Sequence, residues 1–218
     1  MEVQLRNREI IKTLDELVDI FFSKPGYDDP KYRLASKNWD KPANPEYYCS
    51  ETNLQQLLDK WEDHKGFPEE HMAQPISKMV EIDYDMWAHF RDLCRVGMTM
   101  DIGAQHAALT NYYPPGGFVG WHTNWNAPAY QILFTWSRTG EGYFRYFDGK
   151  KIVTIEDKPG WQVRWYHFGW IQDPVNHCWH SAYTYCDRIT LAYKFDNKYD
   201  DAAAQLMRDH CVEELETP

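Results

Sequence analysis

The sequence contains few cysteines, and none at the spacings that make ligands or cross-links. Its five cysteines are an odd number, lie far apart, and include no C-x-x-C pair. A disulfide framework and a cysteine-rich zinc site are therefore not indicated. Reduced thiols are expected, and we interpret Cys178 and Cys186 as packing or surface thiols because only histidine stands near them as a basic neighbour.

Basic residues and long apolar runs are also scarce. The chain has 23 Lys and Arg against 33 Asp and Glu, for a net charge of −10. It lacks the basic footprint of proteins that bind nucleic acid or anionic membranes. No apolar run is long enough to span a bilayer, and the N-terminus lacks the basic start and apolar core of a signal peptide. We expect a cytoplasmic protein without a nucleic-acid or membrane partner, and nothing indicates its oligomeric state.

The first third of the chain has a helical texture. Apolar residues recur at three- and four-residue steps from Glu9 to Ser23, which predicts an amphipathic helix ended by the Lys-Pro-Gly that follows. A second helix is predicted from Ser50 or Thr52 through Trp61, and a third after Pro75 that Gly97 stops. Residues 27–48 have no sustained period and are interpreted as a surface excursion whose aromatic residues form either a lid or packing.

After Gly97 the pattern changes to short alternating runs separated by Gly, Pro or Asp turns. Eight strands are predicted, at residues 100–112, 118–124, 130–137, 142–147, 151–156, 162–168, 177–184 and 188–195. Asp148-Gly149 is a hairpin turn signal, and residues 202–214 form a predicted closing helix. The expected organisation is one compact domain that is mainly β with flanking helices. It consists of an N-terminal helical and loop region (1–98), a β core (99–196) and a C-terminal helix or tail (197–218).

A Pro/Gly turn leads into Trp121-His-Thr-Asn124, where the side chains of His122 and Asn124 share one strand face because they are two residues apart. Such a pair could bind a metal ion, with further ligands from 176–182. Two nitrogen ligands and one oxygen ligand on one side of a metal leave open positions, as in non-heme iron(II) oxygenases. Arg188 and Thr190 also share a strand face, and a guanidinium binds a carboxylate in bidentate fashion.

Two histidines compete for the role of distal metal ligand. His180 is favoured because a short turn joins it to Arg188 in a compact hairpin, and His177 is the alternative because it follows Pro174-Val-Asn176. For His167, a position facing the cavity and a position at the surface are both open. The other five histidines are interpreted as ordinary core or surface residues: His64, His71, His89, His106 and His210.

These residues follow the order Tyr-x-Pro-Gly-Gly-x-x-Gly-Trp-His-x-(Asp/Asn), then Gly-Trp-x-x-Arg, then Trp-His-Ser with Arg-x-Thr after it. From about Ala104 to Phe195 the chain resembles the iron(II)/2-oxoglutarate dioxygenase superfamily, in its prolyl-hydroxylase-like branch. The resemblance implies a double-stranded β-helix (a jelly-roll, cupin-like core) flanked by helices. It also implies an oxidoreductase that uses Fe(II), 2-oxoglutarate and dioxygen to hydroxylate an unactivated carbon, with oxidation of 2-oxoglutarate to succinate and carbon dioxide.

The resemblance also implies roles for individual residues. His122 is the first metal ligand, His180 the distal one, and Asn124 occupies the position of the usual Asp. Arg188 with Thr190 holds the far carboxylate of 2-oxoglutarate. The pocket-lining positions match three aromatic residues, Tyr112, Phe134 and Trp136.

Asn124 is the departure from the family pattern. A neutral amide oxygen is a poorer iron(II) ligand than a carboxylate. Three outcomes are open for Asn124. It coordinates the metal, or it lies away from the metal and leaves a coordination position for water or an anion, as in halogenase relatives. In the third outcome, the site has lost turnover. The predicted function is hydroxylation of an unidentified small-molecule or peptide substrate. The alternatives are a halogenase-like or other radical outcome, and a catalytically silent β-barrel module that binds a ligand or a metal.

Overall fold

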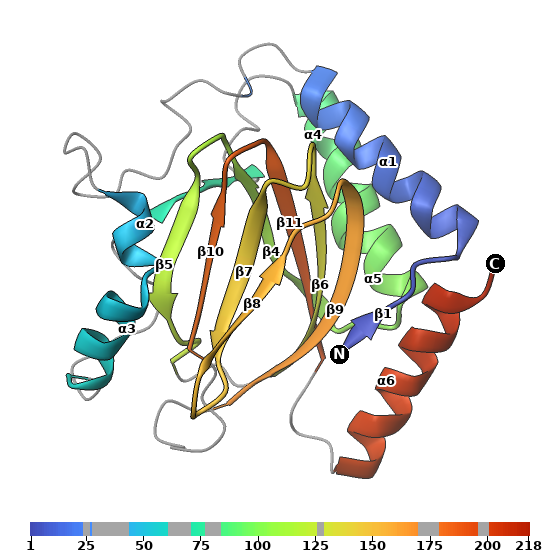
Figure 1. The fold of residues 1–218 in the computed structure, drawn as a ribbon. Coiled ribbons are helices and arrows are strands. Elements are labelled where there is room, and N and C mark those ends of the chain that lie inside the picture. The colour runs from blue at the N-terminus through green and yellow to red at the C-terminus, as the bar shows by residue number, and fades with distance from the viewer. Residues whose placement is uncertain are drawn as a thin grey trace.

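A computed structural model describes residues 1–23, 27, 44–60, 71–76, 84–125, 129–169, 179–195 and 201–218, and within them two antiparallel sheets form the centre of the molecule (Figure 1). The larger sheet has the strand order β1-β9-β6-β11-β4-β3, and the smaller has the order β2-β5-β10-β7-β8. The eight long strands are β4 (His106–Tyr113), β5 (Phe118–His122), β6 (Ala129–Ser137), β7 (Gly142–Phe147), β8 (Ile152–Glu156), β9 (Gly160–Phe168), β10 (His180–Thr184) and β11 (Arg188–Phe195).

The order of these strands identifies the architecture. Strands β4, β6, β9 and β11 belong to the larger sheet, and β5, β7, β8 and β10 to the smaller, so the chain crosses repeatedly between the two. The first long strand pairs with the last, β4 with β11, and the second with the second last, β5 with β10. Nested pairing of this kind is the jelly-roll arrangement. The predicted fold class, mainly β with a double-stranded β-helix core and flanking helices, is confirmed.

Helices cover the outer face of the larger sheet (Figure 1). Helix α1 (Arg8–Ser23) buries Ile10, Leu14, Leu17 and Phe21, which recur at the spacing of one helix face. They join a core cluster with alternate residues of β11, including Ile189, Leu191 and Tyr193. Because neighbouring side chains on a strand point to opposite faces, the other residues of β11 face the interior between the sheets.

The third predicted helix extends past its expected end. Helix α4 (Tyr84–Arg91) continues through a π-helical segment, η4 (Asp92–Gly97), into α5 (Met98–Asp101). Gly97 has a φ of −53°, an ordinary helical value, so it does not act as a left-handed cap. The stop is instead supplied by Gly103 with a φ of +66°. The predicted strand from Met100 consequently begins only at His106.

Six further elements complete the described fold. They are β1 (Glu2–Val3), α2 (Pro45–Tyr48), α3 (Glu51–Leu58), β2 (His71–Met72), β3 (Gln74–Pro75) and the C-terminal helix α6 (Asp201–Glu216). The predicted hairpin between β7 and β8 is present, with Asp148 donating its N–H to the carbonyl of Lys151 around Gly149. No helix in the described ranges is long and apolar enough to cross a membrane.

Candidate functional site

A cavity of about 460 Å³ lies between the two sheets. Residues of β4, β6 and β11 form one wall, and residues of β5, β7 and β10 form the other. Its size falls in the range of small-molecule sites. Five of the residues predicted for the site line it: His122, Asn124, His180, Arg188 and Thr190.

The backbone register brings the two histidines together. His122 ends β5 and His180 begins β10, and the two are direct partners across these antiparallel strands. Their ring centroids lie 4.1 Å apart at an angle of 50° between planes, and both residues are buried. Phe168 packs on the ring of His180 with centroids 4.6 Å apart. Two imidazoles from distant parts of the chain therefore share one small volume.

A backbone contact fixes the tautomer of His122. Its Nδ1 lies 2.8 Å from the carbonyl oxygen of Gly120. A carbonyl oxygen can only accept, so Nδ1 carries the proton and donates it. The lone pair then belongs to Nε2. Histidines that bind a metal through one nitrogen commonly donate the other N–H to a carbonyl in this way, so His122 has the chemistry of a ligand.

Asn124 lines the same cavity although β5 ends two residues earlier. Trp125, the next residue, also lines the cavity and has a φ of +53°, the only positive value at a non-glycine position in the described chain. Strained backbone of this kind concentrates at functional sites. No group of three His, Cys, Asp or Glu side chains in the described ranges is placed to hold a metal ion. The available donors are thus two imidazoles and one carboxamide, which fit a metal more weakly than a set with a carboxylate.

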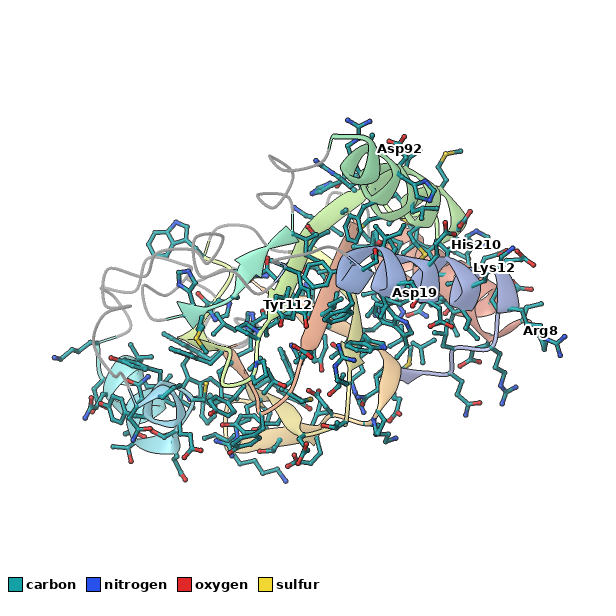
Figure 2. The ribbon with its side chains drawn as sticks, turned by 90° about the horizontal axis from the view of Figure 1, so that it is seen from above. Arg8, Lys12, Asp19, Asp92, Tyr112 and His210 are labelled. Carbon is teal, nitrogen blue, oxygen red and sulfur yellow. The ribbon has the colours of Figure 1, made fainter. Side chains whose placement is uncertain are left out.

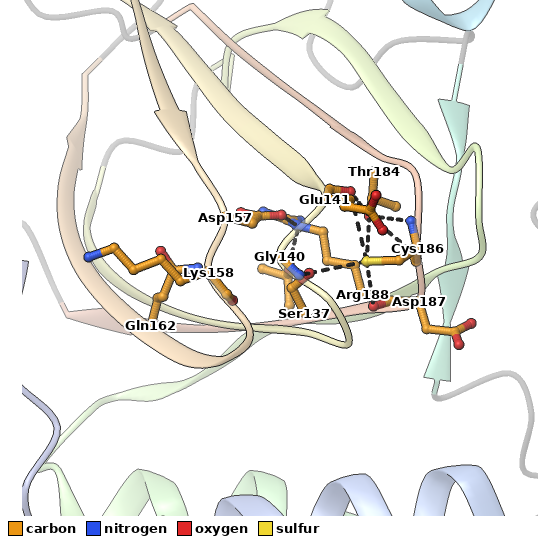
Figure 3. A network of polar contacts seen from close by, with 11 residues as sticks. Ser137, Gly140, Glu141, Asp157, Lys158, Gln162, Thr184, Cys186, Asp187 and Arg188 are labelled. Atoms are coloured by element: carbon orange, nitrogen blue, oxygen red, sulfur yellow. Dashed lines mark hydrogen bonds and ion pairs between the residues drawn. The ribbon is translucent and has the colours of Figure 1, made fainter.

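Arg188 is buried at another part of the cavity wall, and its guanidinium is held on two sides. Its Nε donates to Oδ2 of Asp157 at 2.9 Å (Figure 3). Its Nη1 donates to the hydroxyl of Thr190 at 2.7 Å. Neither bond uses Nη2. The Arg188 and Asp157 side chains are only 3% and 4% exposed, so this ion pair is almost fully desolvated. Thr190 therefore positions the arginine in addition to lining the cavity.

Asp157 and Tyr113 are the functional candidates that sequence reasoning missed. Tyr113 lines the cavity, pairs with Arg188 across β4 and β11, and has the guanidinium carbon 5.3 Å from its ring centroid. Burial raises the pKa of Tyr113 above its ordinary value, against the opposing effect of Arg188. The phenol therefore stays protonated and can donate a hydrogen bond. The sequence signal that identifies Tyr113 is its place in the Tyr-x-Pro-Gly-Gly pattern. No sequence signal identifies Asp157, because its position in the sequence is typical of an ordinary turn residue.

The three aromatic residues predicted to line the pocket are on the other face of the larger sheet. Tyr112, which Figure 2 shows beside α1, packs on Phe21 of that helix with ring centroids 4.8 Å apart. It donates its hydroxyl to Asp187. Phe134 and Trp136 likewise belong to the cluster beneath the helices. None of the three is among the residues that line the cavity. Because strand faces alternate, the cavity is lined instead by the neighbours Tyr113 and Leu133.

The remaining histidines and cysteines are placed as follows. His167 stacks on Tyr130 at 4.3 Å between ring centroids, on the strand face turned away from the cavity, and His89 pairs with Glu16 at the surface. His106 is exposed at the surface, as interpreted, and it also lines the cavity. Cys186 is a buried free thiol. The alternative distal ligand His177, together with His64 and Cys178, lies outside the described residues.

Comparison with solved structures finds matches of limited extent, and the three described here have TM-scores below 0.5. The ribosomal oxygenase YcfD from Escherichia coli matches with a TM-score of 0.31 and 18% identity over 54% of this chain and 30% of that one. A Pseudomonas putida prolyl-4-hydroxylase matches with 0.30 and 13% identity over 57% and 66%. A predicted oxalate decarboxylase from Thermotoga maritima matches with 0.27 and 27% identity over 41% and 66%. No protein-family model and no curated protein sequence matches the chain.

Proposed function

We propose that the protein is a non-heme iron(II)- and 2-oxoglutarate-dependent oxygenase that hydroxylates its substrate. The observation that carries this proposal is the pairing of His122 with His180 inside a cavity that Arg188 also lines. His122 and His180 would hold the metal, with Asn124 as the neutral third donor. Bound iron(II) and 2-oxoglutarate would supply the oxidation: one atom of dioxygen enters succinate as carbon dioxide leaves, and the other enters the substrate.

The chain's own residues would bind and orient the cosubstrate. Tyr113 and Nη2 of Arg188 offer hydrogen-bond donors to a carboxylate, and Asp157 and Thr190 fix the guanidinium so that little ordering is needed on binding. The apolar walls, including Leu133, Phe144 and Phe168, exclude water from the region around the histidines.

Anaerobic titration with iron(II) and 2-oxoglutarate tests this function. Chelation of the metal by 2-oxoglutarate produces a visible charge-transfer band, which the wild-type protein should show. His122→Ala and His180→Ala should abolish the band. His89→Ala should leave it unchanged, because His89 is exposed and pairs with Glu16 outside the cavity. Absence of the band in the wild-type protein at saturating ligand would contradict the proposal and favour a binding module without turnover.

A matched variant tests the arginine. Arg188→Gln alone would leave the buried Asp157 carboxylate unpaired, which destabilises a fold by about 3–5 kcal/mol. The double variant Asp157→Asn/Arg188→Gln removes both charges and keeps a neutral hydrogen-bonding pair. It should retain iron(II) binding and lose affinity for 2-oxoglutarate. Unchanged affinity for 2-oxoglutarate in the double variant would exclude Arg188 from the cosubstrate site.

Halogenation is the second candidate, and Asn124 favours it. A carboxamide leaves the metal site one unit more positive than a carboxylate does, which suits an additional anion such as chloride. Turnover with iron(II), 2-oxoglutarate and chloride separates the two chemistries by mass spectrometry of the product. A chlorinated product would replace hydroxylation by halogenation as the function.

A further inference from the structure

One face of β11 forms a line of residues through the cavity. Arg188, Thr190, Ala192 and Lys194 alternate along this strand and all line the cavity. At about 3.4 Å per residue, the backbone positions of Arg188 and Lys194 are about 20 Å apart. Threonine and alanine between the two cations are small, which leaves the space open along the line. The cavity therefore has a cation near each end of this strand.

The Lys194 end is a polar row that crosses three strands. Lys194 pairs directly with His106 of β4 and with Gln131 of β6, and all three residues line the cavity. Directly paired residues in an antiparallel sheet have their side chains next to each other. Lysine, protonated histidine and the glutamine amide can all donate hydrogen bonds. This row is separate from the His122 and His180 pair, which belongs to the opposite sheet.

The charge of the cavity wall is opposite to that of the whole protein. The chain carries a net charge of −10, yet no Asp or Glu occurs among the described residues that line the cavity. Asp157 neutralises Arg188 from outside this lining. Within the described part of the chain, Lys194 takes part in no ion pair. A half-buried lysine attracts anions when the described residues around it in the cavity include no acid.

We propose that the substrate is a small molecule with an apolar body and one anionic group, a carboxylate or a phosphate, and that Lys194 with His106 binds the anionic group. This inference rests on the proposed oxygenase function, because it treats the ligand at Lys194 as the substrate beside the two histidines. The apolar body lies against Leu109 and Leu133, which pair with Ala192 between the two cations, and against Phe168, which lines the same cavity.

Binding of simple probes to the metal-free protein tests the anion site. Isothermal titration calorimetry compares phenylacetate and hydrocinnamate with their neutral amides, phenylacetamide and hydrocinnamamide. The carboxylates should bind more tightly than the amides. Lys194→Gln should weaken carboxylate binding by roughly tenfold, since one charged hydrogen bond has about that effect. Lys194→Arg should restore it, and Lys151→Gln, at an exposed turn, should have no effect.

The outcomes separate this inference from the oxygenase proposal. Carboxylates that bind no better than amides, or a carboxylate affinity that Lys194→Gln leaves unchanged, would overturn the anion site whether or not the protein binds iron. Conversely, a loss of affinity in Lys194→Gln together with no charge-transfer band would support the anion site and refute the oxygenase. The same titration with phenyl phosphate in place of the carboxylates tests whether the site prefers a phosphate group. Tighter binding of phenyl phosphate than of the carboxylates would identify phosphate as the preferred group.

Discussion

At the scale of single residues, Asn124 offers the most direct test of metal binding. A carboxylate in place of the carboxamide adds a charged oxygen donor beside two imidazoles. Asn124→Asp should therefore tighten iron(II) binding by roughly tenfold, or about 1.4 kcal/mol. Anaerobic equilibrium dialysis measures the dissociation constant directly.

The control for Asn124→Asp is Gln131→Glu, which adds the same charge to the opposite sheet of the same cavity. If iron affinity rises equally in both variants, the gain is a general effect of charge. If it rises in neither, position 124 is outside the coordination sphere.

The Arg188–Asp157 pair predicts opposite effects on stability and on ligand affinity. Asp157→Asn leaves a buried guanidinium without its counter-ion, so the free energy of unfolding should fall by about 3 kcal/mol. The same change removes a charge that repels an incoming dicarboxylate, so affinity for 2-oxoglutarate should rise. Urea unfolding with and without 2-oxoglutarate measures both effects.

Asp92→Ala is the control, because it breaks an exposed ion pair and should lower the free energy of unfolding by less than about 1 kcal/mol. A loss of affinity alongside the loss of stability would contradict the predicted rise and show that the orientation of the guanidinium by Asp157 outweighs the repulsion of its charge.

Cys186 should ionise near neutral pH. Burial raises the pKa of its thiol, but hydrogen bonds with Ser137 and Thr139 lower it more strongly, to about 7. Figure 3 shows the contact between Ser137 and Cys186. The folded thiol then loses its proton between pH 7 and 9 while the unfolded thiol keeps it, so this group stabilises the fold increasingly as pH rises through that window and not below it. The rate of iodoacetamide labelling at Cys186, followed by peptide mass spectrometry, should have its midpoint near pH 7.

Ser137→Ala is the matched variant for this titration. It removes a contact of 3.2 Å between the hydroxyl and the thiol sulfur, so the labelling midpoint should move upward. An unchanged midpoint would show that Ser137 does not set the acidity of the thiol.

At the scale of elements, the start of β7 is packed directly against the arginine network. A Cβ at Gly142 would lie 2.7 Å from Oδ2 of Asp157 and 2.9 Å from the carbonyl of Tyr183. Gly142→Ala should destabilise the fold by roughly 1–3 kcal/mol, because the backbone carbonyl cannot move aside cheaply. Gly97→Ala is expected to have the opposite sign, since Gly97 is helical and its nearest atom would be at 3.6 Å. Urea midpoints that move alike in both variants would contradict this.

Strand β4 shows why sequence patterns predicted the strand itself but not which of its two faces lines the cavity. Tyr112 and Tyr113 are adjacent and chemically identical, so the alternating pattern is satisfied with either one facing inward. The pairing of Arg188 with Tyr113 determines that Tyr113 is the residue that faces the cavity. A register shift opposite Ala192 and Tyr193 then changes which residues of β4 face the cavity nearer the start of the strand. Both facts depend on contacts between residues far apart in the sequence. His122 was predictable because the turn and strand that place it are local, whereas β5 ends at His122, so strand alternation does not account for Asn124 although that residue lines the cavity.

At the scale of the whole molecule, the two ends of the described chain are joined. The backbone N–H groups of Arg6 and Asn7 donate to the carbonyl of Leu215, and β1 pairs with β9. Leu215 is fully buried in the main core cluster. Leu215→Ala should lower the free energy of unfolding by about 2–5 kcal/mol. Leu206→Ala, on the exposed side of the same helix, should change it by less than about 0.5 kcal/mol. Equal effects of the two substitutions on urea unfolding would show that α6 does not contribute to the core.

The strands themselves were largely predictable from composition and alternation, and β7 and β11 match their predicted bounds. The order of strands within each sheet was not derivable from local pattern, since β4 and β11 pair across the length of the core. That order came only from the family resemblance. Asp157 illustrates the same limit at the site, because only the folded chain brings this turn residue to Arg188.

The meeting of His122 and His180 is set by backbone pairing, so it does not depend on the side chains that line the rest of the cavity. Exchanges at Ala192, Leu133 or Gln131 would reshape the space around the two rings without moving them. The lining of the cavity and the histidine pair can therefore diverge separately during evolution. An engineer could use the same independence to retarget the cavity by altering one wall while the imidazole pair stays in place.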